Sequence, residues 1–177
     1  MLTLTGVIKE NNIEKIMAIA IFAGSFDPPT YGHLNIIERA RQIFDEIDVV
    51  IAVNPEKKCL FSDKERLSVL ESLVSEWDNV SVHLWSGLIV DYAKKRGAKV
   101  MLRGIRNVRD FSYEFDLSLM NRTLNNSIET FFISTEPKYF IVKSSAIKDL
   151  AAFGADVSEM VPPIIAKMLK EKFSKMN

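Results

Sequence analysis

The residues best suited to chemistry in this sequence lie in a short turn, residues 24–33, which ends in Gly32-His33. The turn follows a continuous apolar run and precedes a helical pattern, so we expect it to lead from a buried strand into a helix N-terminus. Unpaired backbone N–H groups and the helix dipole favour a phosphate there, and the His33 imidazole would add another donor. A lone histidine at this place is often an ordinary helix residue, but the neighbouring Asp27-Pro28 and Gly32 favour a functional role.

The turn matches neither of the two familiar nucleotide-binding motifs. It lacks the Gly-Lys-Ser/Thr of a Walker loop, and its glycines do not have the Gly-x-Gly-x-x-Gly spacing of a dinucleotide fingerprint. Other parts of the chain must therefore indicate which phosphate the turn would bind.

A second stretch with possible chemistry, residues 102–114, contains three arginines, at positions 103, 106 and 109. A basic turn in contact with solvent is the usual interpretation of such a charge cluster. We expect Arg103, however, just past the carboxyl end of a strand, where doubly wound sheets bind their ligands. Arginine binds phosphate through paired hydrogen bonds, so Arg103 is a candidate phosphate ligand.

The elements that must position these motifs alternate along the chain. Apolar runs predict strands at 18–23, 47–53, 80–85, 99–102 and 128–133, and periodic patterns predict helices at 34–44, 62–77, 88–96, 110–124, 144–153 and after Pro162-Pro163. Ser62 and Glu65 have capping-box spacing, and Gly97 is expected to end its helix. This alternation predicts a single-domain, Rossmann-like α/β fold with a doubly wound, five-stranded parallel sheet.

The composition limits the partners and the compartment. The 23 basic and 23 acidic residues of the 177-residue chain balance, so we expect no nucleic acid partner. No apolar run approaches the roughly 18 residues of a membrane span, and no signal-peptide pattern is present, so we expect no membrane association and a cytoplasmic location. The single cysteine, Cys59, excludes an intramolecular disulfide and fits a reducing compartment.

Three stretches resemble known signatures. Residues 24–33 resemble the T/SFDPxxxGH signature of the nucleotidylyltransferase superfamily. Residues 102–114 resemble the LIRGLRxxxD[FY]xYE motif of the phosphopantetheine adenylyltransferase family, and the match continues through Met120-Asn121-Arg122. Residues 139–148 resemble that family's W/Y-x-x-I-S-S-S/T-x-[VI]-K segment, except that Lys143 replaces a small hydroxyl residue.

The resemblance implies a nucleotidylyltransferase domain over residues 17–177, preceded by an extension of unknown role, residues 1–16. The reaction that it implies is transfer of AMP from MgATP to 4′-phosphopantetheine, giving dephospho-coenzyme A and pyrophosphate. Mg²⁺ would accompany ATP without a dedicated set of protein ligands. The family is typically hexameric, so a homohexamer is expected.

The resemblance also implies roles for individual residues. The catalytic residues would be His33, as transition-state stabiliser, with Lys57 and Arg103, which would fix the phosphate of phosphopantetheine. Ser25 would contact both substrates, and Ile89 would line the pantetheine arm. The residues expected to bind ATP are Ser25, Phe26, His33, Gly104, Ile105, Arg106, Glu114, Tyr139, Phe140, Ile141, Val142, Lys143, Ser144 and Ser145.

Two other functions compete with this interpretation. The turn also resembles the opening motif of nicotinate mononucleotide adenylyltransferases, but residues 144–148 do not match their usual late Ser-x-Thr-x-x-Arg segment. A non-catalytic nucleotide-binding module would share the fold, because a fold alone does not fix function. The joint presence of His33, Lys57 and Arg103 argues against such a module.

Overall fold

The structure is a computed structural model that describes residues 18–140 and 143–175, so the extension predicted at residues 1–16 lies outside the described residues. Strands and helices alternate as predicted. The strands are β1 (Ile19–Gly24), β2 (Glu46–Val53), β3 (Val80–Ser86), β4 (Val100–Ile105) and β5 (Glu129–Ser134). The helices are α1 (Tyr31–Ala40), α2 (Asp63–Val74), α3 (Ile89–Arg96), α4 (Val108–Leu124), α5 (Ser144–Ala152) and α6 (Pro163–Ser174), with a 3₁₀ turn at Pro137–Tyr139.

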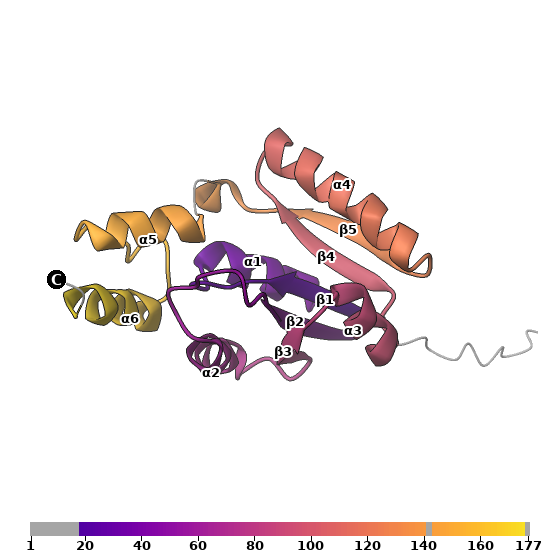
Figure 1. Cartoon of the computed structure of the whole chain (residues 1–177), viewed down its shortest axis with the longest axis horizontal. Helices are drawn as coiled ribbons and strands as arrows, with labels where there is room; N and C mark the ends of the chain where they lie inside the picture. The colour runs from indigo at the N-terminus through magenta and orange to yellow at the C-terminus, as the bar shows by residue number, and fades with distance from the viewer. Residues whose placement is uncertain (1–17, 141–142, 176–177) are drawn as a thin grey trace, which may run out of the picture.

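All five strands pair in parallel, in the order β3-β2-β1-β4-β5, which confirms the predicted α/β fold (Figure 1). The chain builds the sheet outward from β1 to β3 and then returns to the other side of β1 with β4. Between β1 and β4 lies the point where the strand order reverses, and open α/β sheets bind their ligands at the carboxyl ends of the strands there. The predicted motif at residues 24–33 begins at the last residue of β1, and the motif at residues 102–114 begins within β4 and continues past its end.

The helices cover both faces of the sheet. One core cluster packs α1 and α2 against the sheet through Ile37 and Leu70, and a second cluster packs α3 through Val90 and Ala93. A third cluster joins α5 and α6 to α2, and these two helices lie side by side at one end of the molecule (Figure 1). The α5–α6 pair therefore stands next to the start of α1, where the predicted turn lies.

Strand β4 extends further than predicted, and this changes the setting of the basic stretch. The strand was expected to end at residue 102, but it pairs with β5 as far as Ile105. Glycine is unfavourable within strands, so Gly104 marked an early end in the sequence pattern. Its missing side chain makes room for α1, because a Cβ there would lie 2.3 Å from Ile36 Cδ1. Arg103 and Gly104 therefore belong to a strand and not to a loop.

Two helices also differ from the prediction. Helix α1 ends at Ala40, so Ile43 is 72% exposed and does not continue the helical apolar face. Helix α4 was expected to bury an apolar face, but none of its residues is buried. Its exposed hydrophobic residues are Val108, Phe111, Tyr113, Phe115, Leu119, Met120 and Leu124. The described chain leaves much of this apolar surface uncovered.

The predicted start of α2 and the predicted end of α3 are confirmed. Ser62 Oγ accepts the Glu65 N–H at 3.3 Å, and the Glu65 carboxylate accepts the Ser62 N–H at 2.7 Å, which completes the capping box of α2. Gly97 ends α3 with a φ of 73°, a conformation that a residue without Cβ adopts easily.

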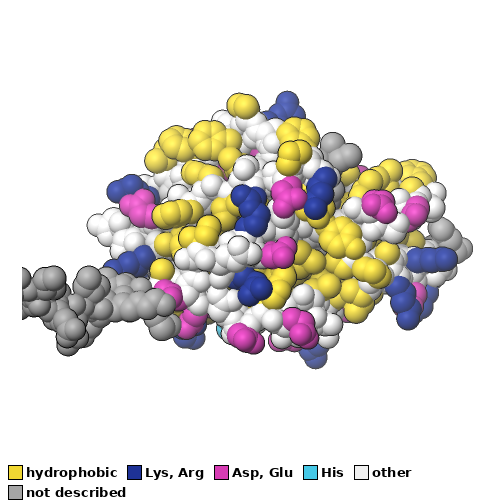
Figure 2. Space-filling view, turned by 180° about the vertical axis from the view of Figure 1, so that it is seen from behind, with side chains coloured by type: hydrophobic (Ala, Val, Ile, Leu, Met, Phe, Trp, Pro, Cys, Tyr) yellow, Lys and Arg dark blue, Asp and Glu magenta, His cyan; other side chains and the backbone are white. Residues whose placement is uncertain are grey.

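The surface carries charges of both signs. Figure 2 shows acidic and basic side chains interspersed on one face, with groups of hydrophobic side chains between them. Neither sign dominates that face, in keeping with the zero net charge of the chain. Of the helices in the described ranges, none combines the length and the apolar character needed to cross a membrane.

A buried carboxylate holds α3 against the sheet. Asp48 of β2 is fully buried and accepts hydrogen bonds from Tyr92 Oη and Arg96 Nε, each at 2.9 Å, and from Ser81 Oγ at 3.0 Å. Burial and the nearby Asp48 carboxylate raise the pKa of Tyr92, so its hydroxyl stays protonated as a donor. This network fixes the helix whose first residue is Ile89.

Loss of one donor to Asp48 should destabilise the protein. We expect Tyr92→Phe to lower the free energy of unfolding by about 1.5–3 kcal/mol, because hydrogen bonds to a buried charge are stronger than average. Urea unfolding at one fixed protein concentration measures this change. Tyr113→Phe removes the same hydroxyl from a 64% exposed tyrosine and should change stability by less than about 0.5 kcal/mol. Equal effects of the two changes would contradict the role of Asp48.

Candidate active site

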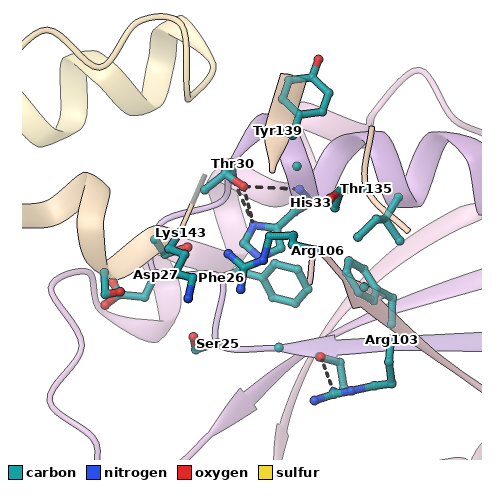
Figure 3. A pocket seen from close by; sticks show the side chains of 18 of the residues that line it. Ser25, Phe26, Asp27, Thr30, His33, Arg103, Arg106, Thr135, Tyr139 and Lys143 are labelled. Atoms are coloured by element: carbon teal, nitrogen blue, oxygen red, sulfur yellow. Dashed lines mark hydrogen bonds between the residues drawn. The ribbon is translucent and has the colours of Figure 1, made fainter. Parts of the chain in front are cut away.

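A cavity of about 400 Å³ opens at the carboxyl ends of β1 and β4 (Figure 3). It lies where the reversal of strand order predicts a ligand site. Its walls come from both strands, the turn before α1, the β2–α2 loop, α4 and the start of α5. The lining residues are Phe22, Ala23, Gly24, Ser25, Phe26, Asp27, Thr30, Gly32, His33, Ile36, Lys57, Arg103, Gly104, Arg106, Glu114, Thr135, Tyr139, Lys143, Ser144, Ser145 and Lys148.

The turn after β1 has an unusual backbone. Phe26 is buried and has a φ of 46°, in the left-handed region that residues other than glycine rarely adopt. Its ring packs edge-on against Phe22 at 5.6 Å and against His33 at 5.1 Å between ring centroids. The Arg66 guanidinium of α2 donates to the carbonyl oxygen of Ser25. These contacts hold the turn in a conformation that costs free energy, as is common at functional sites.

His33 is fixed by a reciprocal cap at the start of α1. Its backbone N–H donates to Thr30 Oγ1 at 3.3 Å, and its ring Nδ1 accepts the Thr30 backbone N–H at 3.1 Å (Figure 3). A neutral imidazole carries its proton on only one nitrogen. Because Nδ1 accepts a hydrogen bond, the proton lies on Nε2.

The surroundings of His33 keep its ring neutral. Burial, followed by the nearby positive charge of Arg106, lowers the pKa of His33 to about 4. The aromatic rings of Phe22 and Phe26 form part of the apolar environment. At neutral pH the ring is therefore uncharged, and its one N–H group can act as a hydrogen-bond donor.

The cavity is electropositive. Its lining contains five cationic side chains and two carboxylates. Arg103 Nη1 donates to the carbonyl oxygen of Ala23 at 3.1 Å, and its Nε donates to the Glu114 carboxylate. Arg106 Nε donates to Asp110 at 2.8 Å. The two arginines are thus held in fixed orientations.

The remaining cations differ in their pairing. Lys148 binds Asp27 at 2.6 Å. Lys57 and Lys143 form no ion pair with another residue of the described ranges, and both side chains are exposed. These two lysines are therefore available to an anionic ligand.

The structure brings most of the predicted site residues together. Twelve of them line the cavity: Ser25, Phe26, His33, Lys57, Arg103, Gly104, Arg106, Glu114, Tyr139, Lys143, Ser144 and Ser145. Ile89, Ile105 and Phe140 are not among the lining residues. Ile141 and Val142 lie outside the described residues.

Nine cavity residues were not predicted as site residues, and four of them carry polar or charged side chains: Asp27, Thr30, Thr135 and Lys148. Asp27 lies within the motif at residues 24–33, and Lys148 is the last residue of the motif at residues 139–148, so these motifs could have indicated both residues. Thr30 stands three residues before His33, the spacing of a capping box, but histidine is not the usual partner there. Thr135 Oγ1 is buried without a hydrogen-bond partner in the described part of the chain, and no sequence pattern indicated it.

Comparison with solved structures supports the fold. A protein from Vibrio parahaemolyticus assigned as a nicotinate-nucleotide adenylyltransferase matches with a TM-score of 0.67 and 17% identity, over 92% of this chain and 98% of that one. The lipopolysaccharide core biosynthesis protein from Thermoplasma volcanium GSS1 matches with a TM-score of 0.51 and 20% identity, over 68% of this chain and 98% of that one. At such low identity the likeness shows the fold alone.

Sequence comparison is more specific. Residues 21–150 match the family described as Cytidylyltransferase-like. The Phosphopantetheine adenylyltransferase of Caldanaerobacter subterraneus subsp. tengcongensis is 47% identical over 159 residues, which cover 90% of this chain and 99% of that protein. The Phosphopantetheine adenylyltransferase of Desulfosudis oleivorans is 51% identical over 156 residues, with 88% and 93% coverage. This identity over nearly the whole chain shows that the protein belongs to the phosphopantetheine adenylyltransferase family.

Proposed function

We propose that this protein transfers AMP from ATP to 4′-phosphopantetheine, giving dephospho-coenzyme A and pyrophosphate. The observation that carries the proposal is the 47–51% identity, over nearly the full length, to two proteins named for this reaction. The electropositive cavity at the ends of β1 and β4 supports it, because both substrates carry phosphate groups. We assign this activity to a domain over residues 17–177, with residues 1–16 as an extension.

The chemistry requires positioning more than proton transfer. An oxygen of the phosphopantetheine phosphate attacks the α-phosphorus of ATP, a new P–O bond forms, and the bond to the pyrophosphate group breaks. The nucleophile is already anionic, so no general base is needed. Fixed donors that stabilise the developing charge and hold the two phosphates in line account for the catalysis.

His33 is the residue placed to stabilise the transferring group. Its Nδ1 is occupied by the Thr30 amide, so the Nε2–H is the donor that remains for a phosphate oxygen. A donor held by a cap needs no reorganisation when charge develops. Ser25 and the Phe26 amide lie in the same turn and supply the nearby phosphate contacts.

Lys57 and Arg103 are assigned to the phosphate of phosphopantetheine. They approach the cavity from the β2–α2 loop and from β4, and Arg103 is oriented by Glu114 and by the carbonyl of Ala23. Ile89 remains the proposed contact for the pantetheine arm, at the first residue of α3, outside the cavity lining.

The ATP phosphates are assigned to the start of α5. Its N-cap residue, Lys143, makes no side-chain capping bond, so the first N–H groups of the helix, including that of Ser144, are available together with the Ser145 hydroxyl. The Ser144 hydroxyl already donates to the Pro28 carbonyl oxygen at 2.9 Å. Lys143 lines the cavity and adds a positive charge at a position where the family's motif has a small hydroxyl residue. Gly104, Ile105, Arg106, Glu114 and residues 139–142 complete the proposed ATP site.

The residues that the structure describes do not form a resident metal site. In the described ranges no three His, Cys, Asp or Glu side chains gather to hold an ion, and the cavity carboxylates of Asp27 and Glu114 each bind a basic side chain. We therefore treat magnesium as part of the substrate MgATP, bound by phosphate oxygens and water, as this ion prefers.

The assembly is proposed to be a homohexamer, by resemblance to the family. The uncovered apolar side chains of α4 and the edge strand β5, where Phe131 is 51% exposed, support contact between copies of the chain. The mass in solution, by light scattering, tests this, and a monomer would contradict it. A cytoplasmic location is proposed because the free thiol of Cys59 fits a reducing compartment.

The activity is tested by supplying MgATP with either 4′-phosphopantetheine or nicotinate mononucleotide and measuring pyrophosphate. We expect release with phosphopantetheine and little with nicotinate mononucleotide. Release with nicotinate mononucleotide alone would contradict the proposed acceptor. No release with either would favour a non-catalytic nucleotide-binding module.

Replacement of His33 should affect turnover more than binding. We expect His33→Ala to fold and to lower kcat on the order of 100- to 1000-fold, the usual effect of removing one preorganised donor, with little change in ATP affinity. Steady-state kinetics with both substrates measures this. His83→Ala removes the only other histidine, which lies outside the cavity, and should keep normal turnover. Near wild-type turnover in His33→Ala would disprove the role of His33.

Lys57 should act on one substrate only. We expect Lys57→Met to lower kcat/KM for phosphopantetheine roughly 10- to 100-fold, because a charge-assisted hydrogen bond to phosphate is lost, while the KM for ATP changes little. Arg103→Ala should weaken use of the same substrate. The neighbouring Lys58 is exposed and outside the lining, so Lys58→Met serves as the matched control. Unchanged phosphopantetheine kinetics would remove Lys57 from the site.

A further inference from the structure

One buried carboxylate joins three segments of the cavity wall. Asp27 is only 2% exposed. Its Oδ1 accepts the Phe61 N–H at 3.0 Å, and its Oδ2 accepts the Leu60 N–H at 3.0 Å and the Lys148 ammonium at 2.6 Å. These partners stand 34, 33 and 121 residues away in the sequence. Asp27 thus connects the turn before α1, the β2–α2 loop and helix α5.

Each of the three segments carries a group assigned to a phosphate. The turn carries Ser25 and His33, the β2–α2 loop carries Lys57 shortly before Leu60, and α5 begins at Ser144. The proposed reaction requires the ATP phosphates and the attacking phosphate to be aligned. The relative position of these segments therefore determines whether the two phosphates can react.

A second contact docks α5 on the same turn. Ser144 Oγ donates to the carbonyl oxygen of Pro28 at 2.9 Å. Together with the bond from Lys148 to Asp27, this fixes α5 at its first residue and one turn further along. The start of the helix is therefore placed by the turn that holds His33, while Ile147 packs in the core cluster behind it.

The electrostatics favour a charged pair. Burial raises the pKa of the Asp27 carboxyl, but the Lys148 ammonium and the amides of Phe61 and Leu60 stabilise the carboxylate more strongly, so the pKa lies below its ordinary value. Removal of Lys148 would leave a buried anion held only by amides, which disturbs the geometry around it.

We propose that Asp27 and Lys148 are positioning residues, whose buried ion pair holds the Lys57 loop and the start of α5 in register with the His33 turn. The inference rests on the proposed function, because it concerns the alignment of the two substrate phosphates. Neither residue needs to touch a reacting atom for this role. Lys148 also lines the cavity, so direct contact with ATP is the competing explanation.

The test uses Lys148→Met, which keeps the length of the side chain and removes the charge, because a change at Asp27 itself risks misfolding. We expect kcat at saturating concentrations of both substrates to fall roughly 10- to 100-fold, since small misplacement of reacting groups has effects of this size. The KM for phosphopantetheine should rise as well, through the displaced β2–α2 loop. Lys148→Arg, which can still pair with Asp27, should recover most of the lost turnover.

Lys167→Met is the matched control, because that lysine of α6 is 77% exposed and its contact with Glu171 is long, at 3.9 Å. Its kinetics should equal those of the wild type. A double-mutant cycle with Lys57→Met then tests the connection through Asp27. We expect Lys148→Met to affect phosphopantetheine kinetics much less when Lys57 is already absent, because coupled residues are not additive.

Three outcomes would overturn the proposal. A rise in the KM for ATP alone, additive with Lys57→Met, would show that Lys148 contacts ATP directly. A lower melting temperature with unchanged kinetics would show a purely structural ion pair. Failure of Lys148→Arg to recover turnover would show that pairing with Asp27 is not what matters. If the wild-type protein itself transfers no AMP, the proposed function fails instead, so the two failures are distinguishable.

Discussion

The reciprocal hydrogen bonds between Thr30 and His33 are the interaction on which the site depends. The same hydrogen bonds cap the N-terminus of α1 and fix the orientation of the imidazole ring. Because the ring accepts from the Thr30 amide, the tautomer is set by the backbone and not by the ligand. Burial, followed by the positive charge of Arg106, lowers the pKa of His33 and keeps the ring uncharged, so His33 serves the cavity as a neutral donor.

The sheet topology explains how this donor meets the other phosphate-facing groups. The reversal of strand order places the carboxyl ends of β1 and β4 next to each other, which brings Arg103 to the turn before α1. Carboxylates then orient some of the cations, as Glu114 does for Arg103, and leave Lys57 and Lys143 without an ion pair among the described residues. Such an arrangement can stabilise phosphate charge through groups held in fixed positions, without proton transfer by a side chain.

Much of this could be predicted from the sequence, because local patterns determine it. Continuous apolar runs indicated the parallel strands, and the Ser62 capping box marked the start of α2. The predicted end of β4 was wrong. Glycine is unfavourable within strands, and only the structure shows that α1 packs too closely for a side chain at Gly104. The bond between Asp27 and Lys148 spans 121 residues, so only the folded chain reveals it. The exposure of the apolar side chains of α4 likewise depends on which elements pack against this helix, so only the folded chain reveals it.

The central claim is that His33 is a neutral Nε2–H donor, and ¹⁵N NMR of the imidazole tests it most directly. In a ¹⁵N-labelled His83→Gln protein, His33 is the only histidine, so its ring signals need no further assignment. The structure predicts a protonated Nε2 and an unprotonated Nδ1 at neutral pH, with ring protonation only near a pH of about 4. A proton on Nδ1, or a midpoint near the ordinary value of 6.5, would contradict the account.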